Sequence, residues 1–212
     1  MSEVTSYLPG FLAAYAVLVV GASSPGPSVA MLIGIAVGQG RTPALVATLG
    51  IAVGSMTINI LTILGVGILL SQAAWAMSAL RVLGALYLAY LAYGAFKRAG
   101  KPPSLQPVET KSKSLVKQFL GGYLLQVSNP KAIAFWLAVA SVGAVEGAGL
   151  GVIVLFVAGG FIISFGCHAA WAVALSVNSV RNAYVAKRRW IETMLGGVFS
   201  FAAVKLAVSS GS

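Results

Sequence analysis

The chain has 212 residues, of which 58% are hydrophobic and 8% are charged. A soluble domain carries roughly 25% charged residues, so this composition excludes a water-soluble fold and predicts a membrane protein. Asp is absent, and fourteen Lys and Arg against four Glu give a formal net charge of +10. Because a transmembrane helix needs roughly 20 residues, the chain has room for about six spans and no large extramembrane domain.

Six apolar stretches follow one another along the chain, and each is long enough to cross a bilayer. They cover residues 11–38, 44–70, 75–96, 119–143, 149–176 and 190–208. The joints around residues 71–74 and 146–149 are short and weakly polar, so a fold of five spans is the alternative. No basic residue precedes Arg41, which argues against a secretory signal and predicts that the first stretch stays in the mature protein.

The one long spacer, residues 97–118, contains three prolines and six basic residues. We predict that it is a linker between a first three-helix repeat, residues 1–96, and a second three-helix repeat, residues 119–212. With six spans, eleven of the fourteen Lys and Arg fall on the side of the membrane that holds this linker. The positive-inside rule therefore places the linker in the cytoplasm and both termini outside.

Stretches one and four each carry a helix-breaking motif near their middle. The first contains Ser24-Pro25-Gly26-Pro27, and the fourth contains Asn129-Pro130-Lys131. Proline removes a backbone donor and glycine frees the backbone, so each helix is predicted to unwind there. Because each half has an odd number of spans, the second half inserts upside down, as in transporters built from inverted repeats. Taken singly, either break is better explained as a repaired proline kink, and it is the pair in corresponding positions that favours a functional role.

The two breaks together predict a substrate site near the midplane. Helices that start after Pro27 and Pro130 point unpaired amides and the positive ends of their dipoles at the site, which suits a carboxylate. Lys131 adds a formal charge at a depth where one costs roughly 2.5 kcal/mol or more, which marks it as functional. Freed carbonyls and nearby polar side chains would accept hydrogen bonds from an ammonium group: Ser23, Ser24, Gln126, Ser128 and Asn129. The predicted ligand is therefore a small zwitterion.

At these residues the sequence resembles the LysE/RhtB family of amino-acid exporters. The resemblance rests on Ser24-Pro25-Gly26-Pro27, a Gly-rich second stretch, the run from Arg81 to Leu88, and Phe119 through Asn129-Pro130-Lys131-Ala132 with Phe135. It covers residues 11 to about 140. The resemblance implies a six-helix protein of the bacterial inner membrane that exports amino acids or related metabolites, driven by the proton gradient. It also implies that the two Pro motifs are the family's motif regions.

The acidic residues bear on the charge of the substrate. Glu3, Glu109, Glu146 and Glu192 are all predicted to lie in tails, loops or helix ends. Without a carboxylate inside the spans a neutral amino acid is favoured over a basic one. A proton would have to be carried by His168 or Lys131, or the coupling is indirect. A structural, hydrogen-bonded role is the alternative for His168. Cys167 is predicted to face elsewhere, because neighbouring helical residues lie about 100° apart.

Three other readings remain as alternatives: an exporter of basic amino acids, an exporter of heavy-metal cations, and a membrane protein without a transport function. The chain has one Cys and one His, which argues against a metal site. The motifs of intramembrane enzymes are missing, so no enzyme and no cofactor are predicted. The basic residues are explained by topology, so no nucleic-acid partner is predicted.

The pentapeptide Gly-Ile-Ala-Val-Gly occurs at residues 34–38 and again at residues 50–54. Its small residues recur every fourth position, which predicts close packing between the first and second stretches. Such small-residue faces permit a homodimer without requiring one.

Overall fold

The computed structural model describes residues 2–72, 74–100, 114–140, 145 and 147–208 of the chain. Within them it contains eight α-helices and no β-strand. The helices are α1 Ser2–Ser23, α2 Pro27–Gly38, α3 Arg41–Gln72, α4 Ala74–Ala99, α5 Leu115–Val127, α6 Pro130–Ala140, α7 Leu150–Ala174 and α8 Asn178–Val208. Three segments, Val4–Ser23, Arg41–Gly65 and Leu150–Ala174, are long and apolar enough to cross a membrane, and two shorter apolar helices accompany them. The protein is therefore an all-α, multi-pass membrane protein.

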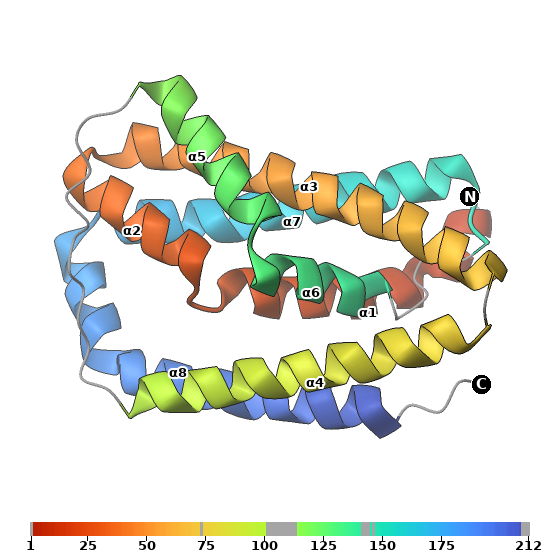
Figure 1. Ribbon diagram of the computed structural model, residues 1–212. Helices are drawn as coiled ribbons and strands as arrows, with labels where there is room; N and C mark the ends of the chain where they lie inside the picture. The colour runs from red at the N-terminus through yellow and green to blue at the C-terminus, as the bar shows by residue number, and fades with distance from the viewer. Residues whose placement is uncertain (1, 73, 101–113, 141–144, 146, 209–212) are drawn as a thin grey trace.

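The helices run back and forth along one common direction (Figure 1). Helices α4 and α8 lie side by side along one edge, α3 packs against α5 and α7, and α1 and α6 lie between these groups. The turns from α2 to α3 and from α7 to α8 lie at one end of the molecule, whereas α1 begins and α8 finishes at the other end. Each pair α1–α2 and α5–α6 crosses the molecule once, as one helix in two pieces.

The interruptions fall at the two Pro motifs that the sequence pointed to. Helix α1 ends at Ser23 and α2 begins at Pro27, with Gly26 as its N-cap; α5 ends at Val127 and α6 begins at Pro130. Proline occupies the first position of both new helices, where its missing N–H and fixed φ cost nothing. At the second break, Asn129 Oδ1 accepts a hydrogen bond from the Lys131 backbone N–H at 3.0 Å, so its side chain satisfies one of the free donors of α6.

Helices α4 and α8 extend beyond the predicted apolar spans into the neighbouring basic residues. Helix α4 continues through Lys97 and Arg98, and α8 begins at Asn178 rather than at residue 190. The prediction that Arg181 and residues 187–189 lie in a loop is therefore wrong. Lys and Arg are good helix formers, so a helix can continue past its apolar segment. Residues 101–113 of the predicted linker lie outside the described residues.

The predicted packing of the first stretch against the second is present, since Leu32 and Ile35 of α2 cluster with Ile51 of α3. The glycines of the motif at residues 50–54 face another helix, α5. A Cβ on Gly50 would collide with the Phe119 carbonyl, and one on Gly122 would collide with the Ala47 carbonyl. The contacts are thus between α3 and α5, on both sides of one helix crossing. The repeat pattern predicted the packing of α2 against α3 but not the closer crossing with α5, because small residues permit approach by whichever helix the topology places beside them.

A buried carboxylate is the second correction. Glu192 lies in the middle of α8 with its side chain fully buried, and Arg98 Nε donates to its Oε1 at 3.0 Å. Arg188, one turn earlier, is 3.9 Å from the same oxygen. The prediction that Glu192 lies at a helix end is wrong, because the two guanidinium groups compensate a charge that would otherwise be too costly to bury. The side chains of Glu3, Glu109 and Glu146 lie outside the described residues.

Aromatic side chains position α6 in the centre of the bundle. Trp136 of α6 is almost fully buried, and its Nε1 donates to Ser55 Oγ of α3 at 2.9 Å. Phe135, on the same helix, packs edge-on against Phe199 of α8 with ring centroids 5.7 Å apart. The start of α6 is therefore fixed between α3 on one side and the α4–α8 pair on the other.

Candidate functional site

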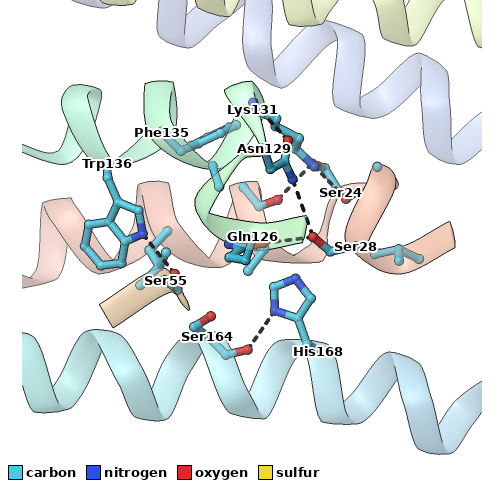
Figure 2. A pocket seen from close by; sticks show the side chains of 16 residues that line it. Ser24, Ser28, Ser55, Gln126, Asn129, Lys131, Phe135, Trp136, Ser164 and His168 are labelled. Atoms are coloured by element: carbon cyan, nitrogen blue, oxygen red, sulfur yellow. Dashed lines mark hydrogen bonds between the residues drawn. The ribbon is translucent and has the colours of Figure 1, made fainter. Parts of the chain in front are cut away.

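The two helix breaks lie on opposite sides of one small cavity (Figure 2). Its walls come from the break between α1 and α2, the break between α5 and α6, and the middle of α3 and α7. Eight polar side chains line it: Ser24, Ser28, Ser55, Gln126, Asn129, Lys131, Ser164 and His168. The apolar part of the wall includes Phe135 and Trp136. The cavity is thus polar where the helices are broken and on the α7 side, and aromatic along α6.

Hydrogen bonds join the start of α2 directly to the second break. Ser28 Oγ donates to Gln126 Oε1 at 2.8 Å, and Asn129 Nδ2 lies 3.4 Å from Ser28 Oγ as a donor. All three side chains are buried. A hydroxyl both donates and accepts, so Ser28 satisfies a group on each side of the second break at once.

Lys131 connects the start of α6 to the first break in the same manner. Its Nζ donates to the Ser24 carbonyl oxygen at 2.8 Å. Ser28 and Lys131 are each the second residue of their helix, directly after Pro27 and Pro130. Each broken helix thus places its second residue on the break of the other.

Helix α7 contributes His168 and Ser164, one turn apart on the same face. His168 is 5% exposed, and its Nδ1 lies 2.8 Å from the Ser164 carbonyl oxygen. Since a carbonyl only accepts, Nδ1 carries the proton, and Nε2 of the neutral ring carries a lone pair. The opposite edge of the ring points towards Ser28 (Figure 2). Ser164 Oγ is buried and has no hydrogen-bond partner among the described residues.

Comparison with protein families identifies the chain. Residues 19–210 match the family model of the LysE type translocator. This range contains both helix breaks and all the cavity residues named above. The chain belongs to the LysE type translocator family. The family resemblance drawn from the two Pro motifs is therefore confirmed.

Several named relatives resemble this translocator along most of their length. It is 27% identical to the threonine efflux protein of Escherichia coli (strain K12), over 94% of this chain and 98% of the relative. It is also 27% identical to the threonine efflux protein of Salmonella typhi, over 90% of this chain and 94% of the relative. An uncharacterized membrane protein of Haemophilus influenzae is 27% identical over 85% of this chain and 88% of the relative. No solved structure matches the chain.

The translocator's cavity gathers most of the residues that the sequence singled out. Ser24, Gly26, Gln126, Asn129, Lys131 and His168 all line it. Pro25, Pro27 and Pro130 are not among the lining residues, and they shape the site through the backbone instead. Ser128 is exposed, and its hydroxyl donates to the Leu124 carbonyl one turn back. Cys167 is half-buried outside the cavity, as the helical angle from His168 predicts.

Sequence reasoning missed Ser28, Ser55 and Ser164. A signal for two of them was present: Ser28 follows Pro27 as Lys131 follows Pro130, and Ser164 precedes His168 by one helical turn. Ser55 had no such signal, because its place in the cavity depends on which face of α3 meets Trp136.

The described wall of the cavity is polar and carries one formal positive charge. Lys131 is the one formally charged side chain among the described residues that line the cavity, and no carboxylate lines it. No group of three His, Cys, Asp or Glu side chains gathers within the described part of the chain.

In this conformation the translocator's cavity is too small for a substrate. Its volume is about 40 Å³, room for about three water molecules. A molecule of the size of an amino acid would fit only if the cavity widened at the two breaks. The hydrogen bonds of Ser28 and Lys131 are the contacts that such a movement would break.

Proposed function

We propose that this translocator exports small neutral amino acids, threonine foremost, through the cavity between its two helix breaks. The observation that carries the proposal is the half-buried Lys131 ammonium, in a polar cavity that no carboxylate of the described residues lines. A carboxylate ligand would be attracted there, whereas a basic side chain would meet a like charge in a medium of low dielectric constant. Two relatives of almost the same length are named threonine efflux proteins.

The wall formed by α7 suits the side chain of a hydroxy amino acid. Ser164 Oγ lies buried without a partner among the described residues, one turn from the His168 ring. A substrate hydroxyl would give Ser164 the hydrogen bond that it lacks. Sites that hydrogen-bond a substrate hydroxyl discriminate strongly against analogues without one, because their polar groups would stay unpaired.

We further infer that the protein has six spans arranged as two inverted repeats, residues 1–96 and 119–212. Exchanging α1 with α5, α2 with α6, α3 with α7 and α4 with α8 maps the contact of α3 with α5 onto that of α1 with α7. It also maps the contact of α2 with α7 onto that of α3 with α6. The contact of α2 with α5 is mapped onto that of α1 with α6. The first crossings of the two halves run in opposite directions in Figure 1. These correspondences support a site at the midplane, on the pseudo-twofold axis.

The orientation that we propose places both termini outside and the basic end in the cytoplasm of a bacterial inner membrane. Arg41 begins α3, Arg98 lies in the last turn of α4, and Arg181 lies in the first turn of α8. All three belong to the end of the molecule that is opposite to the start of α1 (Figure 1). This gathering of positive charge at one end supports the positive-inside assignment.

We propose that the proton gradient drives export. His168 and Lys131 are the titratable side chains of the described cavity wall. Glutamine in place of His168 keeps a donor for the Ser164 carbonyl but cannot carry a proton. If His168 carries the coupled proton, a His168→Gln protein exchanges substrate across vesicle membranes but no longer responds to an imposed pH gradient. A retained response would assign coupling to another group.

Export from whole cells tests the function. Cells that overproduce the protein are loaded with threonine-containing, valine-containing and lysine-containing dipeptides, and the free amino acids that appear outside are measured over time. We expect faster release of threonine than from cells with an empty vector, and release at the empty-vector rate with Lys131→Ala. The proposal fails if no amino acid leaves faster than from the empty-vector cells.

A further inference from the structure

We propose that Lys131 and the Ser24 carbonyl form a latch that opens only for a ligand carrying both a carboxylate and a neighbouring ammonium group. This inference rests on the proposed amino-acid substrate and says how that substrate is recognised. The ligand carboxylate draws Lys131 Nζ away from Ser24, and the ligand ammonium then binds the carbonyl oxygen that Lys131 has left. In the closed cavity the lysine ammonium thus stands where the substrate ammonium will bind.

The helix break leaves the Ser24 carbonyl without its helical donor. In a continuous helix the N–H of Ser28 would bind the carbonyl of Ser24, four residues earlier. The helix ends at Ser23 and resumes at Pro27, so the break turns this carbonyl into an acceptor for side chains. Lys131 Nζ, 2.8 Å away, is the donor that it has. The Ser24 carbonyl oxygen therefore already binds an ammonium group, that of Lys131.

Gly26 leaves space for the end of the Lys131 side chain. A Cβ built on Gly26 would lie 3.1 Å from Lys131 Nζ and 3.2 Å from its Cδ. Gly26 has φ −169°, an extended conformation that any residue adopts. Glycine is therefore not needed here for its backbone freedom. It leaves room for the end of the lysine side chain beside the break.

A ligand with only one charged group cannot open the latch without a cost. An amine without a carboxylate would have to displace Lys131 and leave two positive charges together in a medium of low dielectric constant. A carboxylate without an ammonium group would remove Lys131 from Ser24 and leave a buried carbonyl without a donor. A zwitterion avoids both costs, because each of its charges replaces one partner of the broken hydrogen bond.

The experiment compares three ligands on purified protein in detergent, with equilibrium binding measured by calorimetry. The ligands are threonine, threoninol, which lacks the carboxylate, and 2,3-dihydroxybutyrate, which lacks the ammonium group. In the unaltered protein we expect both analogues to bind at least about 30-fold more weakly than threonine, the range of one lost charge-assisted hydrogen bond.

The variant Lys131→Met distinguishes the latch from a purely structural role of the lysine, because the latch predicts opposite changes of affinity for threonine and threoninol. Methionine keeps most of the side-chain volume and leaves the Ser24 carbonyl free. We expect threonine to bind about tenfold more weakly and threoninol about tenfold more tightly than to the unaltered protein, because the amine no longer competes with a lysine. A loss of affinity for threonine and threoninol alike would overturn the latch.

Gly26→Ala is the second variant, and it keeps the lysine. Its methyl group would lie 3.1 Å from Lys131 Nζ and shift it by a few tenths of an ångström. The ratio of threoninol to threonine affinity should therefore rise, but by less than in Lys131→Met. Gly166→Ala is the matched control, because a Cβ there meets nothing within 4 Å; its ratio should stay unchanged. An unchanged ratio in Gly26→Ala contradicts the latch. If the unaltered protein binds no amino acid and exports none, the proposed function itself is wrong.

Discussion

Arg98 of α4 and Glu192 of α8 join the two helices through one ion pair, with Nε and Oε1 3.0 Å apart. The two partners differ in their surroundings, because the Glu192 side chain is 0% exposed and that of Arg98 is 39% exposed. Glu192 Oε2 has no hydrogen-bond partner among the described residues. The buried Glu192 carboxylate therefore needs its guanidinium partners to compensate its charge, whereas the Arg98 guanidinium can also be solvated by water.

This asymmetry predicts unequal effects of removing the two partners. Arg98→Met leaves a buried carboxylate whose remaining ion-pair partner among the described residues is Arg188, 3.9 Å away. We expect a loss of about 3–5 kcal/mol of stability. Glu192→Gln leaves an arginine that can reach water, and we expect a loss of about 1 kcal/mol. Thermal unfolding in detergent, followed by circular dichroism, measures both.

The double variant Arg98→Met/Glu192→Gln is the control for this pair. We expect it to be more stable than Arg98→Met alone, because no unpaired charge remains buried. Additive losses in the double variant would show that the two side chains act independently.

A second prediction concerns the crossing of α3 and α5. Alanine at Gly50 or Gly122 places a Cβ against a backbone carbonyl of the facing helix. Backbone atoms cannot turn aside as a flexible side chain does, so the helices must separate, at a cost of about 1–3 kcal/mol. We expect a lower unfolding temperature for each variant in detergent.

Gly166→Ala serves again as the control, since space is open around that position in α7. Its unfolding temperature should equal or exceed that of the unaltered protein, because alanine favours a helix over glycine by roughly 1 kcal/mol. Equal effects at all three positions would mean that glycine acts through backbone propensity and not through the close crossing.

The helix breaks could be predicted from sequence because their cause is local. Pro27 and Pro130 lack a backbone N–H and fix their own φ, whatever packs around them. The lysine after Pro130 was predictable as a cavity residue, since it lies near the middle of an apolar stretch, where a charge facing lipid would be costly. Six of the predicted site residues thus line one cavity without any knowledge of the packing.

Glu192 and Ser55 could not be placed in the same way. Whether a carboxylate is buried depends on a guanidinium 94 positions away, and Arg98 reaches it only because α4 lies beside α8. Ser55 enters the cavity because Trp136 of α6 binds its hydroxyl across the bundle. Both facts belong to the arrangement of helices, which a pattern of apolar residues does not specify.

A third prediction tests the role of Ser164 in selecting the substrate. Ser164→Ala removes the buried hydroxyl that lacks a partner among the described residues. We expect threonine to bind about 3–10-fold more weakly, the value of one hydrogen bond, and valine to bind as before or more tightly. Inhibition of labelled threonine exchange in proteoliposomes by each unlabelled amino acid gives the two affinities.

Ser128→Ala is the matched control for that measurement. Ser128 is exposed, and its hydroxyl donates to the Leu124 carbonyl of its own helix. Its replacement should leave both affinities unchanged. Parallel losses for threonine and valine in Ser164→Ala would assign Ser164 to helix packing.

The last prediction concerns orientation, and it uses the fact that Cys167 is the only cysteine of the chain. In a Cys167→Ser background, one cysteine replaces Lys117, exposed at the start of α5, and another replaces Leu150, exposed at the start of α7. With both termini outside, an impermeant maleimide should label the cysteine at 150 in intact cells. The cysteine at 117 should react only after the membrane is permeabilised, because the positive-inside rule places the basic end in the cytoplasm. The reverse pattern would overturn the proposed orientation. Labelling of both positions in intact cells would mean that the two helix starts lie on the same side, which would contradict the inverted repeat itself.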